Sequence, residues 1–263
     1  MNYYRLAYVI LSFLFAFAIQ WIICIKLKNI LIKLIPIIFF TAALIVPLII
    51  AILKNNRGSI VFIFFALYAS FPLAACGMAW GISQMINHKR EEQERIYLRP
   101  YEAEDAEKIL RFCTDEKSFY LWTADRYDKY PISPEIMNEY YLKNNGGCES
   151  GCFYPKTAVN ANGIIGHLIM RYTDIEKKIV RFGFVILDPN SRGKGYGKKM
   201  IRRALEHAFD DLEASKVTIG VFDNNPAAYH CYTSVGFKRV DVPPTPINIM
   251  GEVWHYIELE YTK

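Results

Sequence analysis

The sequence predicts two unlike parts: an all-α segment of three transmembrane helices, followed by an α/β domain built on a mixed sheet. Three observations carry this prediction. Three long apolar runs without formal charge occupy the N-terminal third. After residue 96, short strand-like segments alternate with amphipathic helical ones. Between one such strand and one such helix lies a basic turn with glycine at every second position. A membrane-bound α/β domain with an anionic ligand follows from these features.

The apolar runs lie at about 6–25, 34–53 and 60–82, and none contains Asp, Glu, Lys or Arg. Each is long enough to cross the roughly 30 Å hydrocarbon core of a lipid bilayer as a helix. None shows the polar face that a surface helix of a globular protein carries. We therefore assign residues 1–88 to a multi-pass transmembrane segment, 89–95 to a charged linker and 96–263 to the α/β domain.

The charge distribution orients this segment. Residues 1–88 hold six Lys and Arg and no acidic residue, whereas the other 25 basic residues nearly balance the 26 acidic ones. A domain so close to neutral is not expected to bind nucleic acid. Basic residues gather after the first and third runs, so the positive-inside rule predicts an outside N-terminus and a cytoplasmic C-terminal domain at the cell membrane. The cysteine spacing fits no Cys-x2-Cys pair, so no metal site is expected.

Within the α/β domain, alternation and helical periodicity define the expected elements. Helices are expected at 102–113, 133–143, 195–212 and 226–235, and an irregular aromatic stretch at 118–130. Strands are expected at 96–99, 154–159, 164–172, 179–187, 217–221, 237–240 and 252–261. Arg171 and Arg181 fall on such strands and are expected on the surface of the sheet.

The glycine-rich turn follows the strand that ends at Leu187. Gly193, Gly195 and Gly197 permit a tight turn and a close approach of the backbone to a ligand. Backbone N–H groups then lie beside the positive end of the next helix, and Arg192 and nearby lysines add positive charge. This combination predicts a phosphate-bearing ligand. The spacing lacks the hydroxyl residue of a P-loop and differs from the Rossmann fingerprint.

Two motifs resemble signatures of the GCN5-related N-acetyltransferase (GNAT) family. Arg192-x-x-Gly195-x-Gly197 resembles its acetyl-CoA pyrophosphate loop, and the second motif comprises Asn225, Ala228, Tyr232 and Gly236-Phe237. The resemblance runs from about Ile96 to the C-terminus and is closest to the branch that acetylates protein N-termini, including ribosomal-protein alanine. It implies a mostly antiparallel sheet flanked by helices.

The resemblance also implies the chemistry: an amine attacks acetyl-CoA directly, and Tyr232 protonates the leaving CoA thiolate, with Tyr229 as a neighbouring competitor. The co-substrate would be held by Val185, Ile186, Leu187, Arg192, Gly193, Lys194, Gly195, Tyr196, Gly197, Lys198 and Asn225. The acceptor would be a small-molecule amine or a peptide N-terminus. Loops 118–130 and 144–153 are aromatic and weakly acidic, which suits a cationic amine.

The two motifs do not identify the general base that accepts the proton of the amine. Many family members carry a Glu on the strand before the loop, but residues 180–186 contain no carboxylate. His167 on the adjacent strand is the candidate base because its usual pKa lies near neutrality, and water could relay the proton instead. The missing carboxylate motivates a second hypothesis, a non-catalytic acetyl-CoA sensor signalling through the membrane helices. A third hypothesis is a membrane interaction protein that uses the domain for docking. The sequence does not give an oligomeric state.

Overall fold

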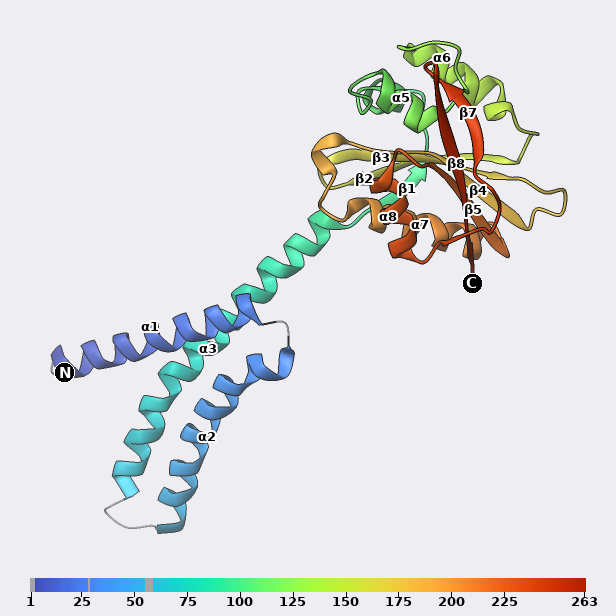
Figure 1. The fold of residues 1–263 in the computed structure, drawn as a ribbon. Coiled ribbons are helices and arrows are strands. Elements are labelled where there is room, and N and C mark those ends of the chain that lie inside the picture. Colours follow the sequence, from blue (N-terminus) through green and yellow to red (C-terminus); the bar gives the residue numbers. More distant parts are fainter. Residues whose placement is uncertain (1–2, 28, 55–58) are drawn as a thin grey trace. The chain divides into compact units, whose positions relative to one another are not determined.

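The structure, a computed structural model, describes residues 3–27, 29–54 and 59–263 and divides into two compact units, Met1–Glu92 and Gln93–Lys263 (Figure 1). The first unit is helical and the second contains the sheet. Each unit is described by itself below.

The N-terminal unit consists of three helices, α1 (Tyr3–Lys26), α2 (Ile30–Lys54) and α3 (Ser59–Glu94). They correspond to the three apolar runs, and α3 extends through most of the expected linker. The buried residues at the contact between α1 and α3 are small, since Ala16 packs among Ala75 and Cys76, and larger apolar side chains of α1 and α2 pack around them. Close packing through small residues is typical of helices that associate within a membrane.

By length and composition, one helix in the described residues can cross a membrane, at Ile30–Ile50; a shorter apolar helix spans Ile10–Lys26. The prediction of three membrane helices is therefore not confirmed. Parts of the predicted spans 6–25 and 60–82 fall on residues whose side chains lie outside the described set.

The second unit is built on a mixed, mostly antiparallel sheet in the order β1-β2-β3-β4-β5-β8-β6, with β7 paired to β8, as the sequence predicted for a mixed sheet. The only parallel pair within the described sheet is β4 with β5. The strands are β1 (Tyr97–Pro100), β2 (Phe153–Asn160), β3 (Gly163–Tyr172), β4 (Ile179–Leu187), β5 (Lys216–Phe222), β6 (Lys238–Arg239), β7 (Thr245–Ile249) and β8 (Glu252–Thr262).

Helices cover both faces of this sheet (Figure 1). On one face, α7 (Tyr196–Glu206), its extension η4 (His207–Asp211) and α8 (Pro226–Val235) bury an apolar core that includes Met200 and Ile201. The opposite face carries α4 (Asp105–Leu110), α5 (Glu116–Thr123), α6 (Pro134–Asn138) and η1 (Glu139–Lys143), together with the aromatic side chains of Phe119, Trp122 and Tyr141. Two short turns of helix, η2 (Asn145–Gly147) and η3 (Pro189–Ser191), complete the unit.

Two elements differ from the sequence prediction. Residues 118–130, expected to be irregular, begin within α5, whose first turn is fixed by a reciprocal cap: the Asp115 carboxylate accepts from the Ser118 N–H at 2.6 Å and the Ser118 hydroxyl accepts from the Asp115 N–H. The spacing Asp-x-x-Ser indicates such a cap. Strand β7 was not predicted because Pro246 disfavours a strand, but β7 pairs only with β8 and so tolerates the missing N–H.

Candidate active site

The site lies where two parallel strands separate. Strands β4 and β5 pair from Ile179 opposite Lys216 to Phe182 opposite Ile219, and no pairing continues beyond that point. Strand β5 remains bonded to β8 as far as Phe222, and β4 remains bonded to β3 as far as Leu187. Each strand therefore keeps its outer partner while the two inner edges open into a wedge.

A bulge in β4 directs its edge into this wedge. Gly183 of β4 lies opposite Ile169 of β3, and Ile186 lies opposite His167. Two residues of β4 therefore face one residue of β3 between these pairs, and one of the two, Phe184, has a φ of 47°. Non-glycine residues adopt this left-handed backbone at a cost, so surrounding contacts must hold it. The Trp122 indole N–H donates to the Phe184 carbonyl at 2.7 Å, and both side chains are buried. Helix α5 thus fixes the bulge.

The glycine-rich turn closes one end of the wedge. Gly193 and Gly195 have φ values of 74° and 80°, and Gly195 is the N-cap of α7. A Cβ at either position would meet open space, so glycine is required there by the backbone and not by crowding. Gly197 differs, because a Cβ there would lie 3.2 Å from Cys231 and from Leu187. The turn therefore presents the first N–H groups of α7 at the end of β4.

A cavity of about 620 Å³ follows the edge of β4 to this turn. Nine of the eleven residues predicted to hold acetyl-CoA line it: Val185, Ile186, Leu187, Arg192, Gly193, Gly195, Gly197, Lys198 and Asn225. Lys194 and Tyr196 are not among its lining residues. An unpaired strand edge, a helix N-terminus and a lysine are the partners that an amide-containing arm and a pyrophosphate require, so the residues present fit acetyl-CoA.

Two predicted residues also have structural roles. The Arg192 guanidinium donates to the Leu187 carbonyl at 3.2 Å and to the Phe112 carbonyl at 3.4 Å, which holds the turn against the end of β4. Asn225 caps α8, since its side-chain oxygen accepts from the Ala228 N–H at 3.2 Å. The side-chain amide of Asn225 still faces the cavity.

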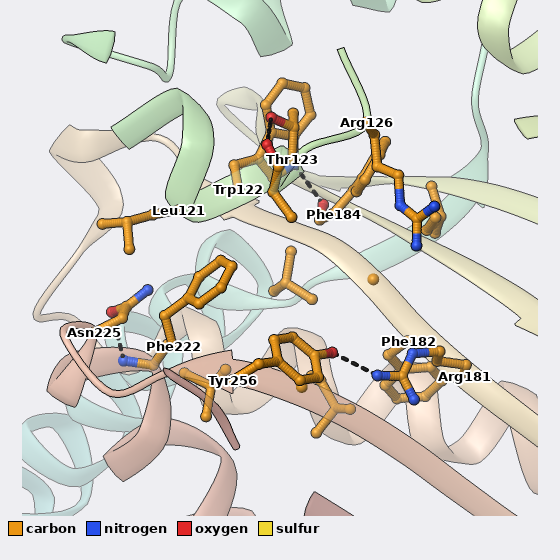
Figure 2. A pocket seen from close by; sticks show the side chains of 18 of the residues that line it. Leu121, Trp122, Thr123, Arg126, Arg181, Phe182, Phe184, Phe222, Asn225 and Tyr256 are labelled. Carbon is orange, nitrogen blue, oxygen red and sulfur yellow. Dashed lines mark hydrogen bonds between the residues drawn. The ribbon is translucent and has the colours of Figure 1, made fainter. Parts of the chain in front are cut away.

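A second cavity, of about 320 Å³, is lined by residues of α5, β3, β4, β5 and β8 (Figure 2). The two cavities share Leu121, Trp122, Val185, Asn225, Ala228 and Tyr232. A ligand in the first cavity and a ligand in the second therefore meet at these residues. This arrangement suits a transfer reaction between two bound molecules.

Tyr232 lies at this junction with 6% of its surface exposed. Burial raises the pKa of its hydroxyl, so the group stays protonated at neutral pH. No side chain or backbone group in the described part of the chain hydrogen-bonds that hydroxyl. Tyr229, on the same helix, is not among the residues that line either cavity.

The structure does not bring His167 to this site. Its side chain is fully buried, its Nε2 lies 3.1 Å from the Tyr141 hydroxyl, and it contacts the rings of Tyr101 and Trp122. Burial lowers the pKa of His167 to about 3. It is not among the lining residues of either cavity, so this position gives no support to a direct role as base.

The charged lining of the second cavity was not anticipated. Arg171 and Arg181, expected on the sheet surface, line it together with Arg126 and Asp125. Arg171 and Arg181 lie opposite each other on β3 and β4, and this part of the sheet surface forms a wall of the cavity. Asp125 and Arg126 were missed because α5, which ends just before them at Thr123, was not predicted.

Comparison with known proteins agrees with this geometry. A family model described as "Acetyltransferase (GNAT) domain" matches residues 95–238. Among curated proteins, spermidine N(1)-acetyltransferase of Vibrio cholerae is 24% identical over 54% of this chain and 79% of its own length. N-acetylaspartate synthetase of Xenopus tropicalis is 32% identical over 40% of this chain and 36% of its own.

A solved structure shares the fold: that of Vibrio cholerae spermidine N-acetyltransferase in complex with CoA and spermine, at a TM-score of 0.55 and 21% identity, over 64% of this chain and 95% of that one. The chain belongs to the GNAT family, as its two motifs predicted. It is an acetyl-CoA-dependent N-acetyltransferase, with acetyl-CoA as co-substrate. The described residues contain no cluster of His, Cys, Asp or Glu that could hold a metal ion.

The buried His167 predicts an acid-sensitive fold. Its pKa is about 3 in the folded chain, against roughly 6.5 when unfolded, so between these values only the unfolded chain binds the proton. Stability should therefore fall as pH falls from about 6.5 to about 3, by up to ~1.4 kcal/mol per pH unit. Denaturant unfolding of the full chain in detergent at several pH values measures this slope.

The variant His167→Gln should reduce the slope by removing the titrating group, whereas His230→Gln, which removes an exposed histidine, should not. An unchanged slope in His167→Gln would show that this histidine is not the group responsible.

Proposed function

We propose that the protein is a membrane-tethered N-acetyltransferase in which the acceptor amine attacks acetyl-CoA directly and Tyr232 protonates the departing thiolate. The observation that carries the proposal is that Tyr232 lines both cavities, with a hydroxyl that stays protonated and has no hydrogen-bond partner among the described residues. A proton donor is needed there because CoA leaves as a thiolate.

The proposed reaction is balanced without a further reactant. The lone pair of the amine nitrogen forms the new C–N bond at the acetyl carbonyl carbon, and the C–S bond breaks. The sulfur takes the proton of the Tyr232 hydroxyl. The nitrogen loses one proton, which returns to Tyr232 through water in the open cavity. The products are an N-acetylated amine and CoA thiol.

A water route is proposed because His167 lies outside both cavities, as described above. Asp125 is the carboxylate that lines the acceptor cavity in the described residues. Since this side chain is exposed, it can pass a proton between the cavity and solvent.

The acceptor is proposed to be a small amine. Two relatives are named for such chemistry: one for spermidine, an amine, and one for N-acetylaspartate, the N-acetyl derivative of the amine aspartate. The resemblance to the branch that acetylates protein N-termini, including ribosomal-protein alanine, predicts a peptide N-terminus instead. A peptide with a free N-terminus is therefore included in the acceptor panel.

Replacing Tyr232 by Phe removes the proposed acid and keeps the ring. We expect kcat to fall by about 10²- to 10⁴-fold, the usual contribution of general acid catalysis, with little change in the KM for acetyl-CoA. Release of CoA thiol by the full chain in detergent, with a panel of amines, measures both. Tyr229→Phe on the same helix is the matched control and should behave as the wild type.

Full activity of Tyr232→Phe would rule out the proposed acid. Binding of acetyl-CoA without transfer to any amine would instead favour the non-catalytic sensor. Absence of acetyl-CoA binding in calorimetry would favour the docking protein.

The membrane part of the proposal is supported by the surface of the N-terminal helices. Large apolar side chains point outward, including Phe15, Leu31, Phe39 and Ile52, which are 65–76% exposed, while Gln20 is fully buried. The Gln20 side chain donates to the Lys33 carbonyl at 2.9 Å. Apolar residues outside and small or polar residues inside suit a lipid environment. Together with the loop lysines, this supports a multi-pass anchor with a cytoplasmic catalytic domain.

Alkaline carbonate washing of membranes tests the anchor. The full chain should stay in the pellet, and protease added outside intact cells should leave the C-terminal domain uncut, because that domain is cytoplasmic in the proposal. Release of the chain by carbonate would contradict the anchor, and external cleavage within residues 96–263 would contradict the orientation.

A further inference from the structure

We infer that the acceptor is a small primary amine that also carries a carboxylate, bound by Arg126 and Arg171 in the second cavity with Arg181 behind them. The inference rests on the proposed function, because it assigns the second cavity to the acceptor. It follows from three features of that cavity: where its arginines lie, which of them are neutralised, and how much charge remains.

The arginines lie away from the reacting end. Leu121 and Asn225, which line both cavities, lie at one side of the pocket in Figure 2, whereas Arg126 and Arg181 lie at the opposite side. Arg126 extends from the segment after α5 and Arg181 from β4. A molecule whose amine reaches the junction therefore places its other end among these guanidinium groups.

The charge of Arg171 acts on the same tyrosines as the charges of Arg126 and Arg181. Burial raises the pKa of the Tyr140 hydroxyl, and the charges of Arg126 and Arg171 oppose that rise. Burial likewise raises the pKa of Tyr256, where Arg181 and Arg171 both oppose it. Tyr140 and Tyr256 both line the cavity, so the three positive charges act on one space.

Only one of the three arginines is neutralised. The Arg181 guanidinium donates to the two Glu258 carboxylate oxygens, at 2.6 and 2.9 Å, and also to the Tyr256 hydroxyl. In contrast, the side chains of Arg126 and Arg171 form no ion pair with any residue that the structure describes. Arg181 therefore acts chiefly to position Tyr256, and the other two are available to a ligand.

The remaining charge fits a monoanion. Three arginines face the lining carboxylate Asp125 and the carboxylate of Glu258 that holds Arg181, which leaves about one positive charge uncompensated. Arginine binds a carboxylate through two parallel hydrogen bonds, and such charge-assisted bonds are stronger than neutral ones. A polyamine would instead bring further positive charge beside Arg126 and Arg171, which opposes binding.

The size of the cavity limits the length of the acceptor between its amine and its carboxylate. A volume of about 320 Å³ is at the low end for ligand pockets. The side chains of Leu121 and Phe222 provide apolar lining on the side of the cavity away from the arginines (Figure 2). A short carbon chain with an amine at one end and a carboxylate at the other fits this lining. The inferred class is thus an amino acid whose carboxylate is separated from its amine by a few carbons.

Matched acceptors test the inference with the full chain in detergent and acetyl-CoA. The probes are β-alanine, 4-aminobutyrate, aspartate and glutamate, each with its side-chain or terminal carboxamide, plus the diamine putrescine and a short peptide. For the best carboxylate, kcat/KM should exceed that of its amide by about tenfold or more, the usual effect of a charge-assisted hydrogen bond.

Variants then assign the effect to the arginines. Arg126→Gln and Arg171→Gln should each raise the KM for the carboxylate about tenfold and reduce the preference over the amide, while the KM for acetyl-CoA stays unchanged. The matched control is Arg203→Gln, because Arg203 is exposed on α7, pairs with Glu206 and lines neither cavity. It should retain the wild-type preference.

Equal rates with carboxylates and amides, or a preference for putrescine or the peptide, would overturn the inference while leaving acetyl transfer intact. An unchanged preference in both arginine variants would also overturn it. If acetyl-CoA binds and no probe is acetylated, the proposed function itself fails, and the inference fails with it.

Discussion

The separation of β4 and β5 after Phe182 is the constraint on which the rest of the site depends. A continuous parallel pair would satisfy its backbone groups internally and leave no room for a ligand. The bulge at Phe184, held by the Trp122 indole, removes the inner edge of β4 from that pairing. The open edge then becomes the wall of one cavity, and the exposed face beside it becomes the wall of the other.

The elements around the wedge supply different parts of the chemistry. The turn at Gly193–Gly195 leads into the N-terminus of α7 at one end of the first cavity, and α8 places Tyr232 where the two cavities meet. Helix α5 both fixes the bulge and leads into the segment that carries Arg126. Tyr232 lines both cavities, and in the proposed mechanism its hydroxyl serves the transfer between a ligand in one cavity and a ligand in the other.

The sequence predicted those parts of the site that depend on local backbone chemistry. Glycines at positive φ and an N-cap asparagine leave a pattern in the sequence, and nine of the residues predicted from it to hold acetyl-CoA line one cavity. The acceptor side could not be predicted in this way. Arg171 and Arg181 meet through the register of β3 and β4, and Arg126 reaches the same cavity from the segment after α5, a tertiary contact that leaves no local pattern in the sequence. The buried position of His167 could not be predicted either, because a strand residue can face the core or a cavity.

The central claim is that the CoA sulfur leaves beside Tyr232, and a structure of the full chain with bound CoA measures this directly. The account predicts the pantetheine arm along Val185–Leu187, the pyrophosphate at the N–H groups of Gly193–Lys198, and the sulfur within hydrogen-bonding reach of the Tyr232 hydroxyl. A sulfur atom remote from Tyr232, or CoA bound outside the wedge, would contradict it.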